Sequence, residues 1–240
     1  QEFHSNQNKS RLELDKLNRF NFNQNYKKNS TNKNLKIFCI ILTTPDRLFT
    51  YALTALSIWG TKCSNYRLIS VIPSNLKNYQ TQNGLNDNFI REPLNLYQPD
   101  NHTHENYDKL TDKVLAAFRD VYKFYKNYDW YIKIDDDSFL HYENLVRFLQ
   151  DKDSQSLLTF GYDIINNFFR LKGGYHAGGP GYIMSKRAFH LLGAELNKNI
   201  SFCYNSGIED YDVARCFRKL NILPGKSIDD LGKFISIHLL

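Results

Sequence analysis

The sequence lacks any apolar run near the ~20 residues that a membrane-spanning helix needs. Its longest candidate, LKIFCIILT from Leu35, has the length of a strand. Glycine and proline are sparse, at 12 and 6 of 240 residues, which argues against a fibrous or disordered chain. The 31 Lys and Arg residues are scattered, although the net charge is +6, whereas nucleic-acid binders usually gather them in a stripe. We therefore expect a globular protein and no nucleic-acid partner.

Cysteine is also scarce, but its number is even. The four residues are Cys39, Cys63, Cys203 and Cys216. They allow three sets of disulfides, or four buried free thiols. Sequons of the form N-x-[ST], which are glycosylated only in the secretory pathway, occur at Asn8, Asn29, Asn101 and Asn199. The chain begins at Gln1 and not at Met, which predicts a missing upstream signal or anchor.

The chain changes character near residue 35. Residues 1–34 contain nine Asn and are predicted to be an irregular stem or linker. From residue 35 to residue 240, strand and helix patterns alternate, which predicts an α/β domain with a mixed, mostly parallel sheet flanked by helices. The expected strands cover 35–44, 66–73, 129–134, 156–162 and the end of 173–185. The expected helices cover 45–60, 107–128, 141–150, 186–196 and 208–220, and the polar segment up to about residue 104 is expected to be a loop.

Three consecutive aspartates, Asp135, Asp136 and Asp137, follow directly after the strand pattern WYIKI. In open α/β sheets, ligands bind at the carboxyl ends of the strands. Carboxylates crowded there are tolerated when they share a divalent cation such as Mg²⁺ or Mn²⁺. The alternative is a solvated acidic turn in which Asp137 or Ser138 caps the next helix.

A second acidic cluster contains Glu209, Asp210 and Asp212. Carboxylates at the start of a helix interact favourably with its dipole, and for Asp212 we adopt this structural interpretation. For Asp210 the functional alternative is a general base that takes a proton from an acceptor hydroxyl. The glycine-rich run GGYHAGGPGY at 173–182 lies between the two clusters; it either brings backbone close to a ligand or is a mobile loop.

His238 alternates with apolar residues in FISIHLL near the end of the sequence. A single histidine in such a strand pattern is more often a core or edge residue. The alternative is a third metal ligand beside the aspartates, since imidazole is a common ligand of transition metals.

Several blocks of the sequence resemble the β1,3-glycosyltransferases that include fringe, and in particular the core 1 β1,3-galactosyltransferases. The blocks are WYIKIDDDSFLHYENLVRFL, GGYHAGGPGYIMSKRAF and GIEDYDVARCFRKLNI, with IFCIILTTP and SIWGTKC upstream. The resemblance implies a GT-A, Rossmann-like fold and a Golgi membrane protein with a luminal catalytic domain, attached through the missing N-terminal anchor. It also implies Mn²⁺-dependent, inverting transfer of galactose from UDP-galactose to the 3-hydroxyl of GalNAc on a glycoprotein or glycopeptide, and it is compatible with a homodimer.

The resemblance also implies roles for individual residues. Asp137 is the expected principal metal ligand, joined by Asp135 and His238, while Asp135 and Asp136 also serve the nucleotide. Asp210 corresponds to the catalytic base, with Glu209 supporting it. Further implied features are glycines at the sugar site and two disulfides, namely Gly178, Gly179, Cys39–Cys63 and Cys203–Cys216.

Two alternatives remain open beside galactose transfer. The first is the same fold moving another sugar, as fringe does with GlcNAc. The second is a non-catalytic relative that acts as a chaperone or a lectin.

Overall fold

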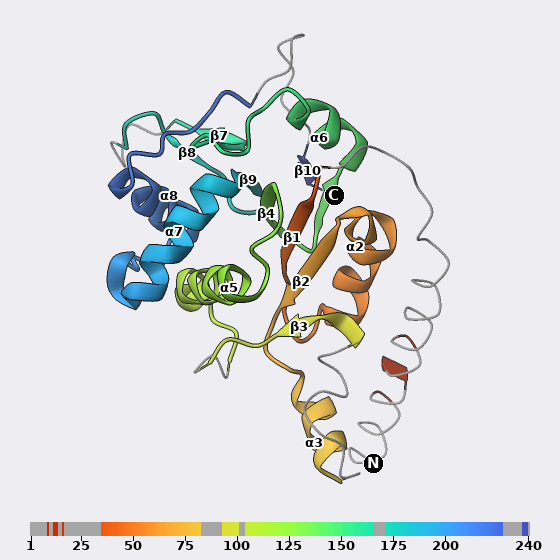
Figure 1. The fold of residues 1–240 in the computed structure, drawn as a ribbon. Coiled ribbons are helices and arrows are strands. Elements are labelled where there is room, and N and C mark those ends of the chain that lie inside the picture. Colours follow the sequence, from red (N-terminus) through yellow and green to blue (C-terminus); the bar gives the residue numbers. More distant parts are fainter. Residues whose placement is uncertain are drawn as a thin grey trace.

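The computed structural model describes residues 35–82, 93–100, 104–165, 171–227 and 237–239, together with isolated positions near the N-terminus. The fold is an α/β sandwich in which helices cover both faces of a central sheet (Figure 1). The predicted stem, residues 1–34, lies outside the continuously described part of the chain. In the described ranges no helix is both long and apolar enough to cross a bilayer.

The central sheet has six strands in the order β3-β2-β1-β4-β9-β6. Strands β3, β2, β1 and β4 run parallel, and β9 runs antiparallel to β4 and β6. The bounds are β1 Ile37–Leu42, β2 Asn65–Ile69, β3 Leu96–Tyr97, β4 Trp130–Asp135, β6 Thr159–Gly161 and β9 Tyr182–Ser185. Two small antiparallel pairs lie outside this sheet: β5 Ser138–Leu140 with β10 Ile237–Leu239, and β7 Asp163–Ile164 with β8 Tyr175–His176. The predicted mixed, mostly parallel sheet is confirmed.

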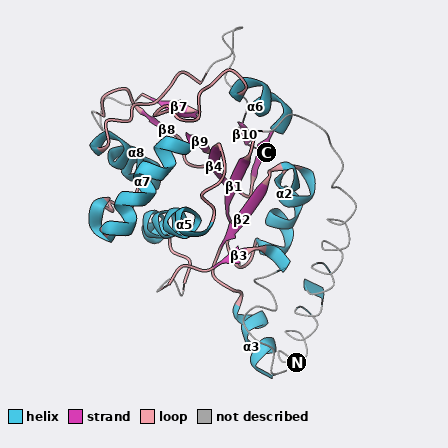
Figure 2. Cartoon of the chain, in the orientation of Figure 1, coloured by secondary structure: helices cyan, strands magenta, loops and turns pink. Residues whose placement is uncertain are grey.

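Strand β1 is buried on both sides because a helical layer covers each face of the sheet. Its residues Ile37, Cys39 and Ile41 pack with one apolar cluster, which includes residues of α2 and α6. Its intervening residues point the other way, as period-2 alternation requires, and pack with residues of α5, α7 and α8. Figure 2 shows the helices on the two sides of the strands. The helix bounds are α2 Leu53–Ile58, α5 Leu110–Phe124, α6 Tyr142–Leu149, α7 Lys186–Lys198 and α8 Glu209–Lys219.

Two predictions about local structure were wrong. The segment expected to be a loop contains helix α3, Ser74–Gln82, and strand β3. The single helix expected at 45–60 is divided into a π-helical turn η1, Leu48–Ala52, then α2, then a 3₁₀ turn η2, Gly60–Lys62. Two further 3₁₀ turns, η3 Tyr107–Lys109 and η4 Ile200–Phe202, precede α5 and follow α7.

Both implied disulfides are present. Cys39 in β1 is bonded to Cys63 just after η2, which ties the central strand to the end of the first helical segment. Cys203 is bonded to Cys216 in α8. Each bond closes a short loop and restricts the unfolded chain, a stabilisation of roughly 3 kcal/mol in the chain-entropy model. The second bond also fixes the segment that leads into the start of α8.

Candidate active site

The three aspartates form a corner where β4 ends and β5 begins; we call Asp135, Asp136 and Asp137 the acid corner. Asp135 is the last residue of β4. Asp136 points inward, with its side chain 2% exposed; one carboxylate oxygen accepts a hydrogen bond from Thr43 Oγ1 at 2.6 Å, and the other forms an ion pair with Arg47 at 2.8 Å. Asp137 is 42% exposed, and Arg47 contacts it at 2.9 Å. The middle aspartate is therefore tied into the protein, whereas its two neighbours lie nearer to solvent.

Arg47 neutralises much of the charge at the acid corner. The segment that follows β1 carries it, and its guanidinium also lies 4.4 Å from the ring centre of Tyr51. Burial alone would lower the pKa of Arg47, but the hydrogen bond to Asp137 and the charge of Asp136 raise it. Burial raises the pKa of Asp136 to about 6, while Thr43 and Arg47 oppose this shift. A cation and a hydroxyl are thus already built into the corner to offset the repulsion among its carboxylates.

Lys133 connects the acid corner with the glycine-rich segment and with α8. Its side chain is 1% exposed and its Nζ lies 2.9 Å from Asp135 Oδ1 and 3.3 Å from Glu209 Oε2. The same nitrogen donates to the carbonyl of Gly178 at 2.9 Å. Burial would lower the pKa of Lys133, but the charges of Asp135 and Glu209 outweigh it and raise the pKa. Lys133 therefore remains a cation and holds three segments of the chain together.

The start of α8 supplies the second acidic cluster. Glu209 is buried and accepts a hydrogen bond from the hydroxyl of Tyr182 at 2.7 Å; burial raises its pKa, and Lys133 partly offsets the shift. Asp210 accepts from the backbone N–H of Gly178 at 3.1 Å and from that of Tyr211 at 2.8 Å. Glu209 is enclosed in the protein, and the neighbouring carboxylate of Asp210 is oriented by backbone donors.

Gly178 lies where any larger residue would collide with the site. A Cβ at this position would come within 2.6 Å of Glu209 Oε2 and 3.4 Å of Lys133 Nζ. At Gly179 a Cβ would lie 3.8 Å from Asp135 Oδ2. The glycine-rich segment therefore passes between the acid corner and Asp210 with its backbone against both. The two acidic clusters and the glycines, predicted from separate parts of the sequence, meet at one place.

Asp212 has the structural role that its position predicts. It is fully buried, and it accepts hydrogen bonds from the hydroxyl and backbone N–H of Ser206 and from the hydroxyl of Thr111 on α5. These bonds fix the start of α8 against α5. Asp212 thus anchors the helix that carries Asp210.

His238 is near the acid corner in the strand register. In the β5–β10 pair it lies opposite Phe139, two residues beyond Asp137. The side chains of β10 lie outside the described residues, so metal binding by His238 stays a prediction.

The acid corner has the donor chemistry that Mn²⁺ prefers. Its two outer carboxylates, Asp135 and Asp137, are partly exposed, and carboxylate oxygen suits a hard divalent cation. Within the described ranges, no three His, Cys, Asp or Glu residues gather closely enough to enclose a metal. An open site with two carboxylates leaves coordination positions for water and substrate phosphate, so the residues present fit a metal shared with a ligand.

A small cavity of about 260 Å³ opens next to the acid corner. Residues of η1 and α2, including Tyr51, form its apolar side together with Trp59, which follows α2, and Asp136, Ser138 and Phe139 form the other. The indole nitrogen of Trp59 donates to the Ser138 carbonyl at 3.1 Å, which fixes this wall. The corner therefore adjoins a mostly apolar recess.

Sequence reasoning missed three residues of this site: Thr43, Arg47 and Lys133. For Lys133 a signal was available, because a lysine inside an otherwise apolar strand pattern is rarely buried without a partner, and it precedes Asp135 by two positions, which places both on one face of the strand. Arg47 and Thr43 follow a different strand. Only the parallel pairing of β1 with β4, with Leu42 opposite Asp135, brings them to the corner.

The mixed, mostly parallel six-stranded sheet flanked by helices is consistent with a GT-A-like glycosyltransferase fold. Residues 100–173 match the family model described as Galactosyltransferase. The chain is 26% identical over 201 residues to glycoprotein-N-acetylgalactosamine 3-beta-galactosyltransferase 1 of Xenopus laevis, covering 82% of this chain and 49% of the relative. It is 29% identical over 139 residues to UDP-GalNAc:beta-1,3-N-acetylgalactosaminyltransferase 1 of Homo sapiens, covering 49% of this chain and 39% of the relative.

The family-model match and the similarity to these relatives support a glycosyltransferase that is similar to the core 1 β1,3-galactosyltransferases. It spans about half the length, or less, of the curated relatives that it matches. The resemblance noted in the sequence blocks is borne out by these comparisons.

Proposed function

We propose that the chain carries the catalytic site of an inverting glycosyltransferase, which moves galactose from UDP-galactose to the 3-hydroxyl of GalNAc on Ser or Thr. The observation that carries the proposal is the meeting of the acid corner, the glycine-rich segment and Asp210 around Lys133. This arrangement offers both a site for a nucleotide diphosphate and a general base. The similarity to the Xenopus galactosyltransferase supports the choice of sugar and acceptor.

Asp210 is the proposed general base. It takes the proton of the acceptor hydroxyl while that oxygen attacks the anomeric carbon of the donor. The bond between this carbon and the phosphate oxygen breaks, and its electron pair leaves with UDP. Attack from the face opposite to the leaving group inverts the anomeric centre. The hydrogen bonds from Gly178 and Tyr211 orient the carboxylate for this step.

Glu209 and Lys133 are proposed to position the site. The ion pair between them is buried, and Lys133 also holds the Gly178 carbonyl. Because Gly178 donates its N–H to Asp210, the pair fixes the segment that orients the base. Glu209 supports Asp210 in this way without contacting the sugar.

Donor binding is assigned to the acid corner and the glycines. Asp137, Asp135 and His238 would hold Mn²⁺, and when bound this ion supplies charge that stabilises the departing diphosphate. Asp135, Gly178 and Gly179 would contact the sugar nucleotide. The oxygens of Asp136 are engaged by Thr43 and Arg47, so we assign Asp136 to holding the corner that the nucleotide meets.

A luminal Golgi location, N-glycosylation at some of the sequons and a homodimeric state belong to the same proposal. The two disulfides support it, since such bonds persist in oxidising compartments. The acceptor partner would be a glycoprotein or glycopeptide that bears GalNAc.

A UDP-release assay with identification of the product tests the proposal. Purified protein with Mn²⁺ is offered UDP-Gal, UDP-GlcNAc or UDP-GalNAc, each with a GalNAc-peptide, an O-fucosyl peptide or a simple sugar. We expect UDP release with UDP-Gal and the GalNAc-peptide, and a β1,3-linked product by NMR. Selective use of UDP-GalNAc or UDP-GlcNAc would contradict the choice of donor and show a different transferase. Absence of release with every pair would favour the non-catalytic chaperone or lectin alternative.

A further inference from the structure

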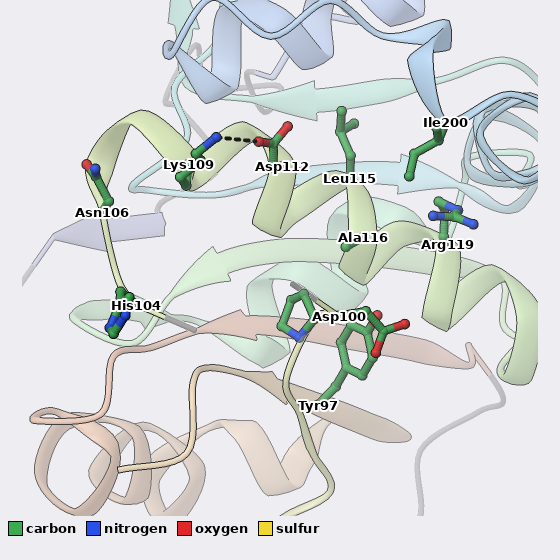
Figure 3. A pocket seen from close by; sticks show the side chains of 11 residues that line it. Tyr97, Asp100, His104, Asn106, Lys109, Asp112, Leu115, Ala116, Arg119 and Ile200 are labelled. Atoms are coloured by element: carbon green, nitrogen blue, oxygen red, sulfur yellow. Dashed lines mark ion pairs between the residues drawn. The ribbon is translucent and has the colours of Figure 1, made fainter. Parts of the chain in front are cut away.

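A second and larger cavity lies on the outer side of α5 (Figure 3). Its volume is about 620 Å³, within the ~300–1,000 Å³ range of small-molecule sites. Side chains of η3 and α5 line one side, the segment that follows β3 lines the other, and Ile200 of η4 lies at one end. None of its lining residues belongs to the acid corner or to α8. The cavity is therefore separate from the candidate active site.

Helix α5 presents one continuous stripe to this cavity. Asp112, Leu115, Ala116 and Arg119 line it, and their spacing of three, four and seven residues puts them on one face of a helix. Other residues of α5 face the protein: Val114 and Phe118 pack in the core, and Leu115 of the stripe packs there as well. The charged members of the stripe are thus not required to bury the helix.

The charged groups in the stripe are only weakly engaged by the protein. Asp112 lies 3.8 Å from Lys109, and their side chains are 51% and 62% exposed; exposed pairs of this kind contribute little. The Nε of Arg119 is buried and has no hydrogen-bond partner within the described ranges. Burial keeps Nε itself from a ligand, but Arg119 lines the cavity and forms no ion pair in the part of the chain that the structure describes, so the terminal nitrogens of its guanidinium can donate to a ligand oxygen.

The lining also restricts the chemistry of the ligand. The two cations, Lys109 and Arg119, are balanced by two carboxylates, Asp100 and Asp112, so the cavity selects neither strong anions nor strong cations. A hydroxyl both donates and accepts, and bonds to charged partners are the strong ones. A neutral ligand with many hydroxyls can therefore accept hydrogen bonds from the two cations and donate hydrogen bonds to the two carboxylates.

Apolar groups complete the lining. Ile200 is 66% exposed at the end of the cavity, Leu115 lies on the helical wall, and the ring of Tyr97 lies across from that wall (Figure 3). The C–H faces of a sugar ring can pack on such groups. We propose that this cavity is a second, non-catalytic binding site for a short neutral saccharide.

The test is binding, and it does not depend on transfer. N-acetyllactosamine and lactose, neither of which contains the proposed acceptor sugar GalNAc, are titrated into metal-free, nucleotide-free protein, and binding is followed by saturation-transfer NMR and calorimetry. We expect one of these probes to bind to the wild-type protein. Arg119→Ala should weaken that binding by about tenfold or more, since one hydrogen bond to a charged group contributes ~1.5–3 kcal/mol.

Three further variants make the result specific. Asp112→Ala changes an exposed residue and should weaken binding without affecting folding. Lys123→Ala removes a cation one turn further along α5 that does not line the cavity, and should leave binding unchanged. Asp210→Asn should also leave it unchanged, so that failure of the proposed transferase reaction would not affect this result.

The proposal is overturned if neither saccharide binds to the wild-type protein. It is also overturned if Asp210→Asn abolishes binding while Arg119→Ala and Asp112→Ala do not. Tight binding of a tetra-aspartate or tetra-lysine peptide in place of the saccharides would assign the cavity to charged ligands and reject the saccharide.

Discussion

The acid corner and the start of α8 are both carboxylate clusters with a cation, but they differ in burial. In the acid corner, Arg47 is 30% exposed and contacts one buried and one exposed carboxylate. At α8, Lys133 is 1% exposed and contacts the buried Glu209 as well as Asp135. In both clusters one carboxylate is enclosed and fixed by the cation, and an adjacent carboxylate lies nearer to solvent. This difference agrees with the proposed roles, in which the enclosed Asp136 and Glu209 give support and Asp137 and Asp210 take part in metal binding and catalysis.

The largest effect is expected from Asp210→Asn. The amide cannot accept the proton of the acceptor hydroxyl, so transfer should fall by about 10²–10⁴-fold, the usual contribution of a general base. Binding of Mn²⁺ and UDP should remain, because the acid corner is intact; calorimetry measures this. The matched control is Asp212→Asn, which changes the buried carboxylate that fixes the start of α8 and should lower the free energy of unfolding. Unaltered turnover in Asp210→Asn would show that another group is the base.

The difference in burial predicts a difference in stability. Lys133→Met leaves Glu209 buried without its counter-charge, and breaking a buried pair costs about 3–5 kcal/mol. Arg47→Met should cost less, because solvent reaches both the arginine and Asp137. Urea unfolding of the two variants measures the comparison. Equal losses of unfolding free energy in the two variants would mean that the two cations do not have the different roles inferred here. The double variant Lys133→Met with Glu209→Gln should recover part of the stability that Lys133→Met loses, because it also removes the buried charge.

The sequence predicted the strand and the helix that carry the aspartates of these two regions, but it did not predict every residue that contacts those aspartates. Strand β4 and helix α8 were foreseen because an apolar run and an amphipathic pattern are local signals, and the aspartates that follow or begin them are visible in the sequence. Arg47 reaches the corner only through the pairing of β1 with β4, which no local pattern encodes. Helix α3 was missed because its sequence, SNLKNYQTQ, is mostly polar, although Leu76 is buried. Strand β3 is only two residues long.

A smaller effect is expected at the exposed member of the acid corner. Asp137→Ala should reduce Mn²⁺-dependent UDP affinity by about tenfold or more, the order of magnitude that loss of one charged contact produces. The free energy of unfolding should change little, since the side chain is 42% exposed. Fluorescence titration with and without Mn²⁺ separates the two quantities. Undiminished Mn²⁺-UDP binding by the variant would remove Asp137 from the metal site.

The smallest effect concerns pH. The pKa of Asp136 is raised to about 6, above the ordinary value of about 3.9 for an unfolded chain, so the folded protein binds this proton more tightly. Its contribution to stability is then fully present below about pH 4 and is lost as the pH rises to about 6. In metal-free buffer, wild-type protein should lose more stability across this window than Asp136→Asn. Parallel pH profiles would contradict a raised pKa at this residue.

The most direct test of the account is a crystal grown with MnCl₂ and a non-hydrolysable UDP-galactose analogue, with anomalous data collected at the manganese edge. The account predicts an anomalous peak at bonding distance from Asp137 and Asp135, with the galactose on the side of Asp210. A manganese peak elsewhere, or a nucleotide bound away from the glycine-rich segment, would contradict it.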